Sequence, residues 1–147
     1  MMKCNNLFFV MIFSTLSLLL AGCKQSSKET NKSSASYDFR FEEYTIEQLQ
    51  DGYKNRTFSI LEVVEAYLDR IEAIDRNGPG LHSVIIVNPD ALTIARNLDR
   101  ELEAGEIRGP LHGIPVLLKD NIDTHDKMPT TAGSLALQNS YPLHDSF

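Results

Sequence analysis

Cysteine is nearly absent from this sequence. The two cysteines, Cys4 and Cys23, lie in the first 23 of the 147 residues, and none follows. The rest of the chain therefore has no disulfide framework and no cysteine metal site, so packing must hold it together. Basic runs are absent too. The 14 Lys and Arg residues are outnumbered by 20 Asp and Glu residues, which gives a formal net charge of −6. This balance argues against nucleic acid or an anionic membrane surface as a partner.

A long hydrophobic run is also missing. Residues 7–21 form a 15-residue apolar stretch after Lys3, whereas a membrane-spanning helix needs about 20 such residues. The length fits the core of a signal peptide, which we assign to residues 1–22. The stretch ends in Leu-Ala-Gly-Cys at residues 20–23, which resembles a lipobox, where the cysteine is lipidated and the chain is cleaved before it.

A plain signal peptide followed by a coincidental cysteine is the alternative. On the lipobox interpretation, residues 23–40 comprise the lipidated Cys23 and a flexible tether, since residues 24–36 are polar apart from Ala35. The protein is then exported and lipid-anchored to a bacterial membrane in the cell envelope.

Three helices are predicted after the tether. Capping boxes at residues 45–48 (T-I-E-Q) and 59–62 (S-I-L-E) open the first two. The first is short and ends near Gly52. The second carries one apolar face and stops at a Gly-Pro-Gly sequence at residues 78–80; the face consists of Ile60, Val64, Tyr67, Ile71 and Ile74.

The third helix is predicted to begin with Asn88 as N-cap and Pro89 in the first turn, and to end at Gly105. Its apolar face comprises Leu92, Ala95, Leu98 and Leu102. Two short apolar runs, 83–87 (S-V-I-I-V) and 114–118 (I-P-V-L-L), predict buried strands. The order helix, helix, strand, helix, strand predicts a mixed α/β layer fold.

Lys119 stands directly after the second apolar run. Burial opposes the charge of a lysine and can lower its pKa far enough to make it a base near neutral pH. Such a base can take a proton from a serine hydroxyl. The alternative is a charged lysine that pairs with Asp120 or Asp123 at the rim of the sheet.

Two long motifs extend this interpretation. The sequence G-P-L-H-G-I-P-V-L-L-K-D-N-I-D at residues 109–123, followed by P-T-T-A-G-S-L-A-L at residues 129–137, resembles the amidase-signature family. The resemblance implies an α/β fold, a mixed β-sheet covered by helices, of which residues 41–147 are the N-terminal part. It also implies a Ser–cis-Ser–Lys triad, in which Lys119 is the lysine and both serines lie further along. No cofactor is implied.

Other polar residues are weaker candidates. Ser134 lacks the glycine-rich surroundings of an oxyanion hole, so a loop or helix-start role is favoured over a nucleophile. Asp120, Asp123, His125 and Asp126 match no standard metal spacing, and we expect turn residues and no metal. Asp120 and Asn121 are expected to orient Lys119 or its loop. His112 is expected to be a turn residue with a backbone hydrogen bond, and Gly109, Gly113 and Pro115 to shape the backbone.

The resemblance implies hydrolysis of linear amides, with a small molecule or a peptide as substrate. Among these it favours peptides with an amidated C-terminus. We expect the complete protein to be the enzyme and this chain alone to be inactive. An amidotransferase component that uses charged transfer RNA is opposed by the export signal. A non-catalytic lipoprotein module built on a truncated amidase scaffold is the alternative of a different class. As a partial domain, the chain should expose apolar surface on residues 60–74 and 114–118.

The lipobox generates the first testable prediction. Cells that express the protein and are fed a clickable fatty acid should label the wild type at Cys23, and Cys23→Ala should remove the label. Cys4→Ala is the matched control and should label like the wild type, because Cys4 leaves with the signal peptide. Equal labelling of wild type and Cys23→Ala would contradict lipidation.

Overall fold

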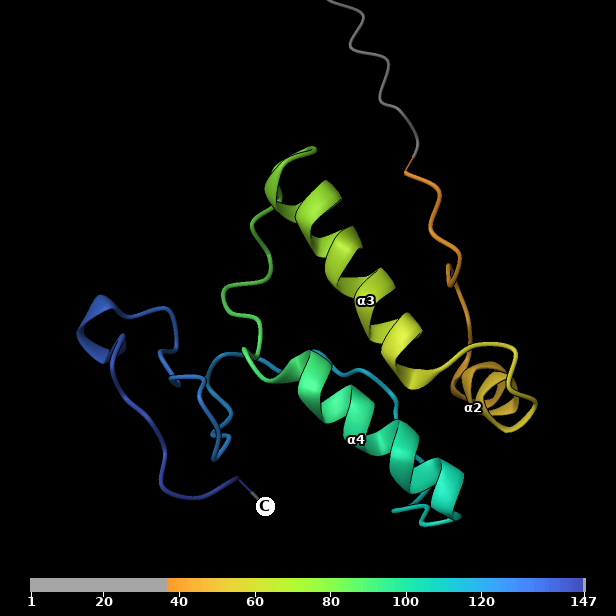
Figure 1. The fold of residues 1–147 in the computed structure, drawn as a ribbon. Coiled ribbons are helices and arrows are strands. Elements are labelled where there is room, and N and C mark those ends of the chain that lie inside the picture. Colours follow the sequence, from red (N-terminus) through yellow and green to blue (C-terminus); the bar gives the residue numbers. More distant parts are fainter. Residues whose placement is uncertain (1–36, 147) are drawn as a thin grey trace, which may run out of the picture. The chain divides into compact units, whose positions relative to one another are not determined.

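The computed structural model describes residues 37–146. Its elements are α2 (Ile46–Lys54), α3 (Ile60–Arg70), a π-helical turn η1 (Ile71–Arg76), α4 (Ala91–Ala104) and a 3₁₀ turn η2 (Leu135–Leu137). In Figure 1, α3 and α4 run side by side in opposite directions, and α2 lies near the start of α3. The expected signal peptide and Cys23 lie outside the described residues. Within the described range, no helix has the length and apolar content to cross a membrane.

Both predicted capping boxes are present. The Thr45 hydroxyl accepts the Gln48 amide at 3.2 Å, and the Gln48 side chain accepts the Thr45 amide at 2.8 Å. Ser59 and Glu62 form the same reciprocal pair at the start of α3. Each pair satisfies amides that the first turn of a helix leaves without partners.

The first helix passes its predicted end at Gly52 and continues to Lys54. Gly52 has a packing role instead, because a Cβ atom there would lie 2.0 Å from the Phe58 ring. The ring of Phe58 in turn packs edge-on against Phe41, with centroids 4.9 Å apart. An alanine at position 52 would displace this ring.

Aromatic side chains dominate the core. Phe39 and Phe41 come from the segment before α2, and Phe39 falls within the range 23–40 assigned to the tether. The rings pack edge to face, which is the favoured geometry for aromatic pairs. The buried apolar set is Phe39, Phe41, Leu49, Tyr53, Phe58, Ile60, Val63 and Ala95.

The apolar face of α3 is confirmed in part. Ile60 is buried and Val64 and Tyr67 pack against the core, but the most buried residue is Val63, which the predicted stripe leaves out. The helix therefore turns a face centred closer to Val63 towards α4. The expected exposure of apolar surface on this helix is wrong at Ile60 and Val63, which are 1% and 0% exposed.

Asp99 of α4 joins the two helices. Its carboxylate oxygens accept the amides of Ile60 at 2.8 Å and Leu61 at 3.0 Å, the first two residues of α3. A carboxylate at a helix N-terminus is favoured by both hydrogen bonding and the helix dipole. Together with Ser59, Asp99 satisfies the first three amides of α3.

The start of α4 differs from the expectation. Asn88 is not its N-cap: the helix begins at Ala91 with Asp90 in the cap position and no side-chain cap bond. The Asn88 side chain instead accepts the Asp90 amide at 2.8 Å, which forms a turn before the helix. The predicted end at Gly105 is confirmed, with φ of 80° at that glycine.

The two predicted strands are not formed within the described residues, which contain no strand. Residues 83–87 have no regular secondary structure and are tied to Asp75, whose buried carboxylate accepts the Ser83 amide at 2.7 Å, the Ser83 hydroxyl and the Val84 amide. These bonds, the Ser83 hydroxyl first, lower the pKa of Asp75 below its ordinary value. A strand needs ladder hydrogen bonds to a neighbour, and no other described segment pairs with this one.

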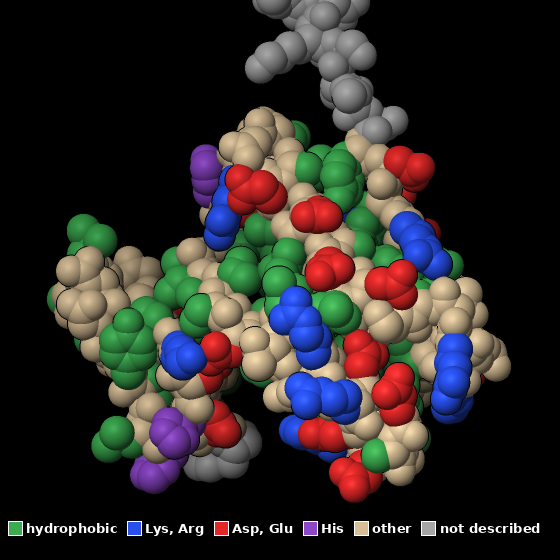
Figure 2. Space-filling model, viewed as in Figure 1, with side chains coloured by type: hydrophobic (Ala, Val, Ile, Leu, Met, Phe, Trp, Pro, Cys, Tyr) green, Lys and Arg blue, Asp and Glu red, His purple; other side chains and the backbone are tan. Residues whose placement is uncertain are grey.

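The second apolar run, 114–118, also has no regular secondary structure and no strand partner among the described residues. Its side chains Val116, Leu117 and Leu118 are 71%, 78% and 54% exposed, so the predicted burial is wrong in this structure and the expected apolar exposure is confirmed. Figure 2 shows apolar side chains on the loop segment at the left of the view. Acidic and basic side chains are interspersed over the face formed by α3 and α4.

Asp99→Ala should lower the free energy of unfolding by about 1–3 kcal/mol, because two amides at the start of α3 lose a charged acceptor. Urea unfolding of the 147-residue chain would measure the change as a lower midpoint at an unchanged slope. Asp69→Ala is the matched control. It removes an exposed helical aspartate on α3 and should stay within about 0.5 kcal/mol of wild type. Equal effects of the two variants would contradict the capping role.

Candidate functional site

A tight turn at residues 109–113 leads the chain towards Lys119. The His112 amide donates to the Gly109 carbonyl at 3.1 Å, and the Ile114 amide donates to the Leu111 carbonyl at 3.1 Å. His112 is buried; its Nδ1 accepts the Arg108 amide at 3.3 Å, and its Nε2 lies 3.0 Å from the Leu98 carbonyl of α4. This arrangement confirms the prediction of a turn histidine with backbone hydrogen bonds and makes Nε2 the protonated nitrogen.

Gly113 fastens the turn to the core. Its φ is 77°, and a Cβ there would lie 2.6 Å from Ile60 Cδ1, so only glycine fits without displacing Ile60. The Tyr53 hydroxyl donates to the Gly113 carbonyl at 2.9 Å. Burial, and secondly the carboxylate of Asp99, raise the pKa of Tyr53 above its ordinary value. The predicted backbone role of Gly113 is confirmed, and Gly109 also has a positive φ, 152°.

Lys119 is exposed, although the sequence predicted a lysine at the end of a buried strand. The segment before it has no strand partner among the described residues, so nothing there covers the lysine side chain. The alternative, an ion pair with Asp120 or Asp123, is not formed either within the described residues. Its backbone is nevertheless held, because its carbonyl accepts the Ile122 amide at 3.0 Å and closes a turn.

Asp120 binds this turn to the second motif. Its side chain accepts the amides of Thr131 at 3.4 Å and Gly133 at 3.2 Å as well as the Thr131 hydroxyl. Its carbonyl accepts the Ala132 amide at 2.8 Å. We call residues 119–122 and 131–133, joined in this way, the Asp120 clamp. It connects the K-D-N and P-T-T-A-G-S motifs, which are the two that carry the resemblance.

Ser134 follows the clamp and starts the 3₁₀ turn η2, as the favoured role predicted. Its amide donates to the Thr131 carbonyl at 2.8 Å. The three amides before it, at Thr131, Ala132 and Gly133, are directed at Asp120. They cannot also stabilise an oxyanion beside Ser134, so this loop lacks the donors that a nucleophile needs.

The acidic and histidine residues after Lys119 act in the loops. Asp126 accepts the Met128 amide at 2.7 Å and the Asn88 side-chain amide at 3.2 Å, and Lys127 pairs with Asp90 at 2.7 Å. These contacts attach the loop to the start of α4. The His125 amide donates to Asp145 at 2.5 Å. Within residues 37–146 no three His, Cys, Asp or Glu side chains gather as a metal site.

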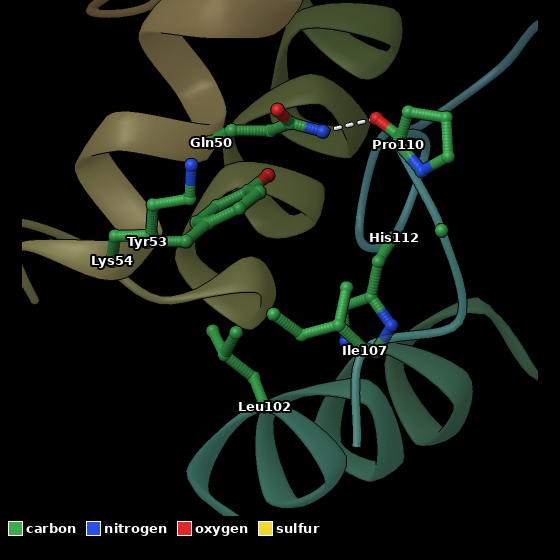
Figure 3. A pocket seen from close by; sticks show the side chains of 8 residues that line it. Gln50, Tyr53, Lys54, Leu102, Ile107, Pro110 and His112 are labelled. Atoms are coloured by element: carbon green, nitrogen blue, oxygen red, sulfur yellow. Dashed lines mark hydrogen bonds between the residues drawn. The ribbon is translucent and has the colours of Figure 1, made fainter. Parts of the chain in front are cut away.

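A shallow hollow of about 260 Å³ lies between the 109–113 turn, α2 and the end of α4. Figure 3 shows side chains from α2, from α4 and from the loop after α4 facing it. Three of its polar side chains are already used, since Gln50 donates to the Pro110 carbonyl and Tyr53 to Gly113, while His112 bonds Leu98 and Arg108. The hollow therefore offers mainly apolar walls; they include Leu102, Ile107 and Pro110.

Comparison with known proteins gives the family. The family model described as Amidase matches residues 62–147, and the chain belongs to this family. A putative amidase of Schizosaccharomyces pombe is 46% identical over 106 residues, which cover 72% of this chain and 18% of that protein. A glutamyl-tRNA(Gln) amidotransferase component from Acidothermus cellulolyticus is 47% identical over 92 residues, 62% of this chain and 17% of that protein.

Among solved structures, the native peptide amidase of Stenotrophomonas maltophilia matches with a TM-score of 0.71 and 48% identity, over 74% of this chain and 22% of that one. A peptide amidase has also been solved with the competitive inhibitor chymostatin. The chain thus spans about a fifth of the length of the relatives it matches.

Sequence reasoning singled out Lys119 and assigned Asp120 to orienting the lysine or its loop, but it missed Thr131. The signal was present in principle, because a threonine in a Thr-Thr-Ala-Gly turn supplies both a hydroxyl and an amide to a carboxylate. The partner could not be found from the pattern, since Asp120 is 11 residues away.

The clamp predicts an acid transition. Hydrogen bonds, mainly from the Thr131 hydroxyl and then from the amides of Gly133 and Thr131, hold the pKa of Asp120 below its ordinary 3.8, although partial burial opposes this. Its contribution to stability is complete above that pH and is lost as the pH falls through the lowered pKa. An NMR titration of the Gly133 amide proton should show a midpoint below 3.8. Asp120→Asn should abolish the step, and a midpoint at or above the ordinary value would contradict the clamp.

Proposed function

We propose that this chain is the N-terminal part of an exported amidase that hydrolyses linear amides. In the complete protein, Lys119 acts in a Ser–cis-Ser–Lys triad, and both serines come from later in the chain. The 147-residue chain alone lacks the nucleophile and the oxyanion donors, so we expect it to be inactive.

The observation that carries this proposal is the Asp120 clamp. It brings the Lys119 turn against the Thr131–Gly133 loop, so the two motifs of the resemblance form one unit. A base must be held within a few tenths of an ångström of its working position to be effective. A lysine on a backbone fastened by four hydrogen bonds to a second loop meets that requirement better than a lysine in a free turn.

The reaction follows from the chemistry of an amine base. Neutral Lys119 takes a proton from the bridging serine, which takes the proton of the nucleophilic serine as its oxygen attacks the amide carbon. The same proton returns through the bridging serine to the nitrogen as the C–N bond breaks, releasing ammonia or an amine. Water then attacks the acyl-enzyme with the same base, which yields the acid and restores the serine.

The likeness to peptide amidases supports peptides with an amidated C-terminus as substrates. The same likeness supports a mixed sheet in the complete protein, in which residues 114–118 form a strand. Pairing there would cover Val116, Leu117 and Leu118, which are exposed in the described chain. It would also give Lys119 the apolar surroundings that favour a neutral amine.

The likeness to an amidotransferase component favours a second candidate, transfer of ammonia onto charged transfer RNA. Residues 1–23 oppose it, because an exported and lipidated protein would not meet that substrate. The non-catalytic lipoprotein module remains the candidate of another class. Export with turnover of a peptide amide supports the first function, and export of a stable protein without turnover supports the module.

Lys119→Ala in the full-length amidase should reduce turnover of a peptide amide by at least about 10²–10⁴-fold, the usual contribution of a general base. Lys119→Arg should fare no better, since a guanidinium stays protonated. The wild-type rate should fall as the pH drops and the amine gains a proton. Ammonia release at several pH values measures all three effects, and circular dichroism checks folding.

Lys127→Ala is the matched control. Lys127 is another exposed lysine in the segment after α4, where it pairs with Asp90, and its loss should leave turnover near wild type. The 147-residue chain should show no turnover. Near wild-type activity of Lys119→Arg would mean that the lysine supplies only a positive charge, and turnover by the 147-residue chain that Ser134→Ala abolishes would make Ser134 the nucleophile.

A further inference from the structure

The Asp120 clamp contains more hydrogen bonds than a turn needs. Three consecutive residues, Thr131 to Gly133, direct four donors at a single residue, three to its carboxylate and one to its carbonyl. The Thr131 hydroxyl also accepts the Gly133 amide at 3.1 Å, which ties the loop to itself. Thr131 is only 9% exposed, so water does not easily replace the bond from its hydroxyl.

The loop adopts a conformation that depends on this anchor. Ala132 has a φ of 48° and Gly133 a φ of 75°. A left-handed conformation is unfavourable for a residue with a Cβ, so Ala132 needs compensating bonds. Its amide obtains one from the Asp120 carbonyl. Without the carboxylate beside it, the loop would relax and release that carbonyl as well.

Lys119 depends on the same contacts. The apolar segment before it has no strand partner among the described residues, and its own side chain is exposed. The backbone at Lys119 is therefore held through the two carbonyls that follow its Cα atom. The Lys119 carbonyl accepts the Ile122 amide, and the Asp120 carbonyl accepts the Ala132 amide. These bonds set the position and direction from which the lysine side chain starts.

We propose that Asp120 is a positioning residue, with Thr131 as its partner: the pair holds the Lys119 backbone against the 131–133 loop and so aims the amine at the proton it must take. The inference rests on the proposed function, in which Lys119 is the base. Asp120 touches neither substrate nor nucleophile in this role, and it exchanges no proton during turnover.

The test is the kinetics of the full-length amidase on a peptide amide. Asp120→Asn and Thr131→Val should each lower kcat per folded molecule by about 10–100-fold, the usual cost of a small misplacement of a catalytic group. KM should change by less than about threefold, because substrate contacts are kept. Thr131→Ser keeps the hydroxyl and should restore kcat to near wild type. The double variant should be no worse than the worse single variant, since both remove one interaction.

The pH profile and a second carboxylate separate positioning from general stability. Asp120→Asn should keep the wild-type fall of rate at low pH, because Lys119 is still the base. Asp126→Asn is the matched control: Asp126 also accepts a backbone amide in the neighbouring loop, and its loss should leave kcat near wild type. Hydrogen exchange of the Thr131–Gly133 amides should quicken in Asp120→Asn and not in Asp126→Asn.

Two outcomes would overturn the inference in different ways. If Lys119→Ala abolishes turnover while Asp120→Asn and Thr131→Val keep wild-type kcat, the lysine is the base and the clamp does not position it. If Lys119→Ala keeps activity, the proposed function fails and this role fails with it. Should Asp120→Asn not fold, Thr131→Val alone decides, since it removes one hydroxyl and keeps the shape of the side chain.

Discussion

The turn at residues 109–113 is the constraint on which the rest of this segment depends. It is fastened to the helices at two buried points: His112 bonds the Leu98 carbonyl of α4, and Gly113 lies against Ile60 and accepts the Tyr53 hydroxyl. Both points exclude substitution for different reasons. The His112 imidazole bonds an amide and a carbonyl at once, and at Gly113 the neighbouring Ile60 leaves no room for a Cβ atom. The turn sets the direction in which the chain leaves towards Lys119, and the contacts of Asp126 and Lys127 with the start of α4 hold the loop that follows.

The aromatic core reaches the site through that turn. Phe58 packs on Gly52 and Phe41, which fixes the start of α3 and with it Ile60. Asp99 then holds the first amides of α3 from the neighbouring helix. A change at any of these residues would move Ile60, then Gly113, and only then the segment that leads to Lys119. The core therefore acts on the site through a short series of contacts, without touching it.

Local signals predicted the helices well, and long-range partners explain what they missed. The capping boxes at Thr45 and Ser59 needed only residues three apart, and both are confirmed. The prediction of Asn88 as the N-cap was wrong because its side chain accepts the amide of Asp90, two residues further on, in a turn. The runs 83–87 and 114–118 carry the composition of strands, but a strand also needs a neighbour, and sequence pattern cannot supply one. His112 was predicted as a turn residue with a backbone hydrogen bond and Ser134 as a loop or helix-start residue, and the bonds of His112 and the place of Ser134 before η2 agree with this.

The position and the surroundings of Lys119 have different origins. Its backbone position comes from bonds spanning 11 to 13 residues, within the Asp120 clamp, and these form in the described chain. In the proposed function, its apolar surroundings would come from residues that pack over Val116, Leu117 and Leu118, which are exposed here. A lysine in water keeps its proton at neutral pH, so placement alone does not make a base. In the proposed enzyme both requirements would be met: the clamp orients the lysine, and burial by further residues of the domain lowers its pKa, so that the neutral amine can accept a proton.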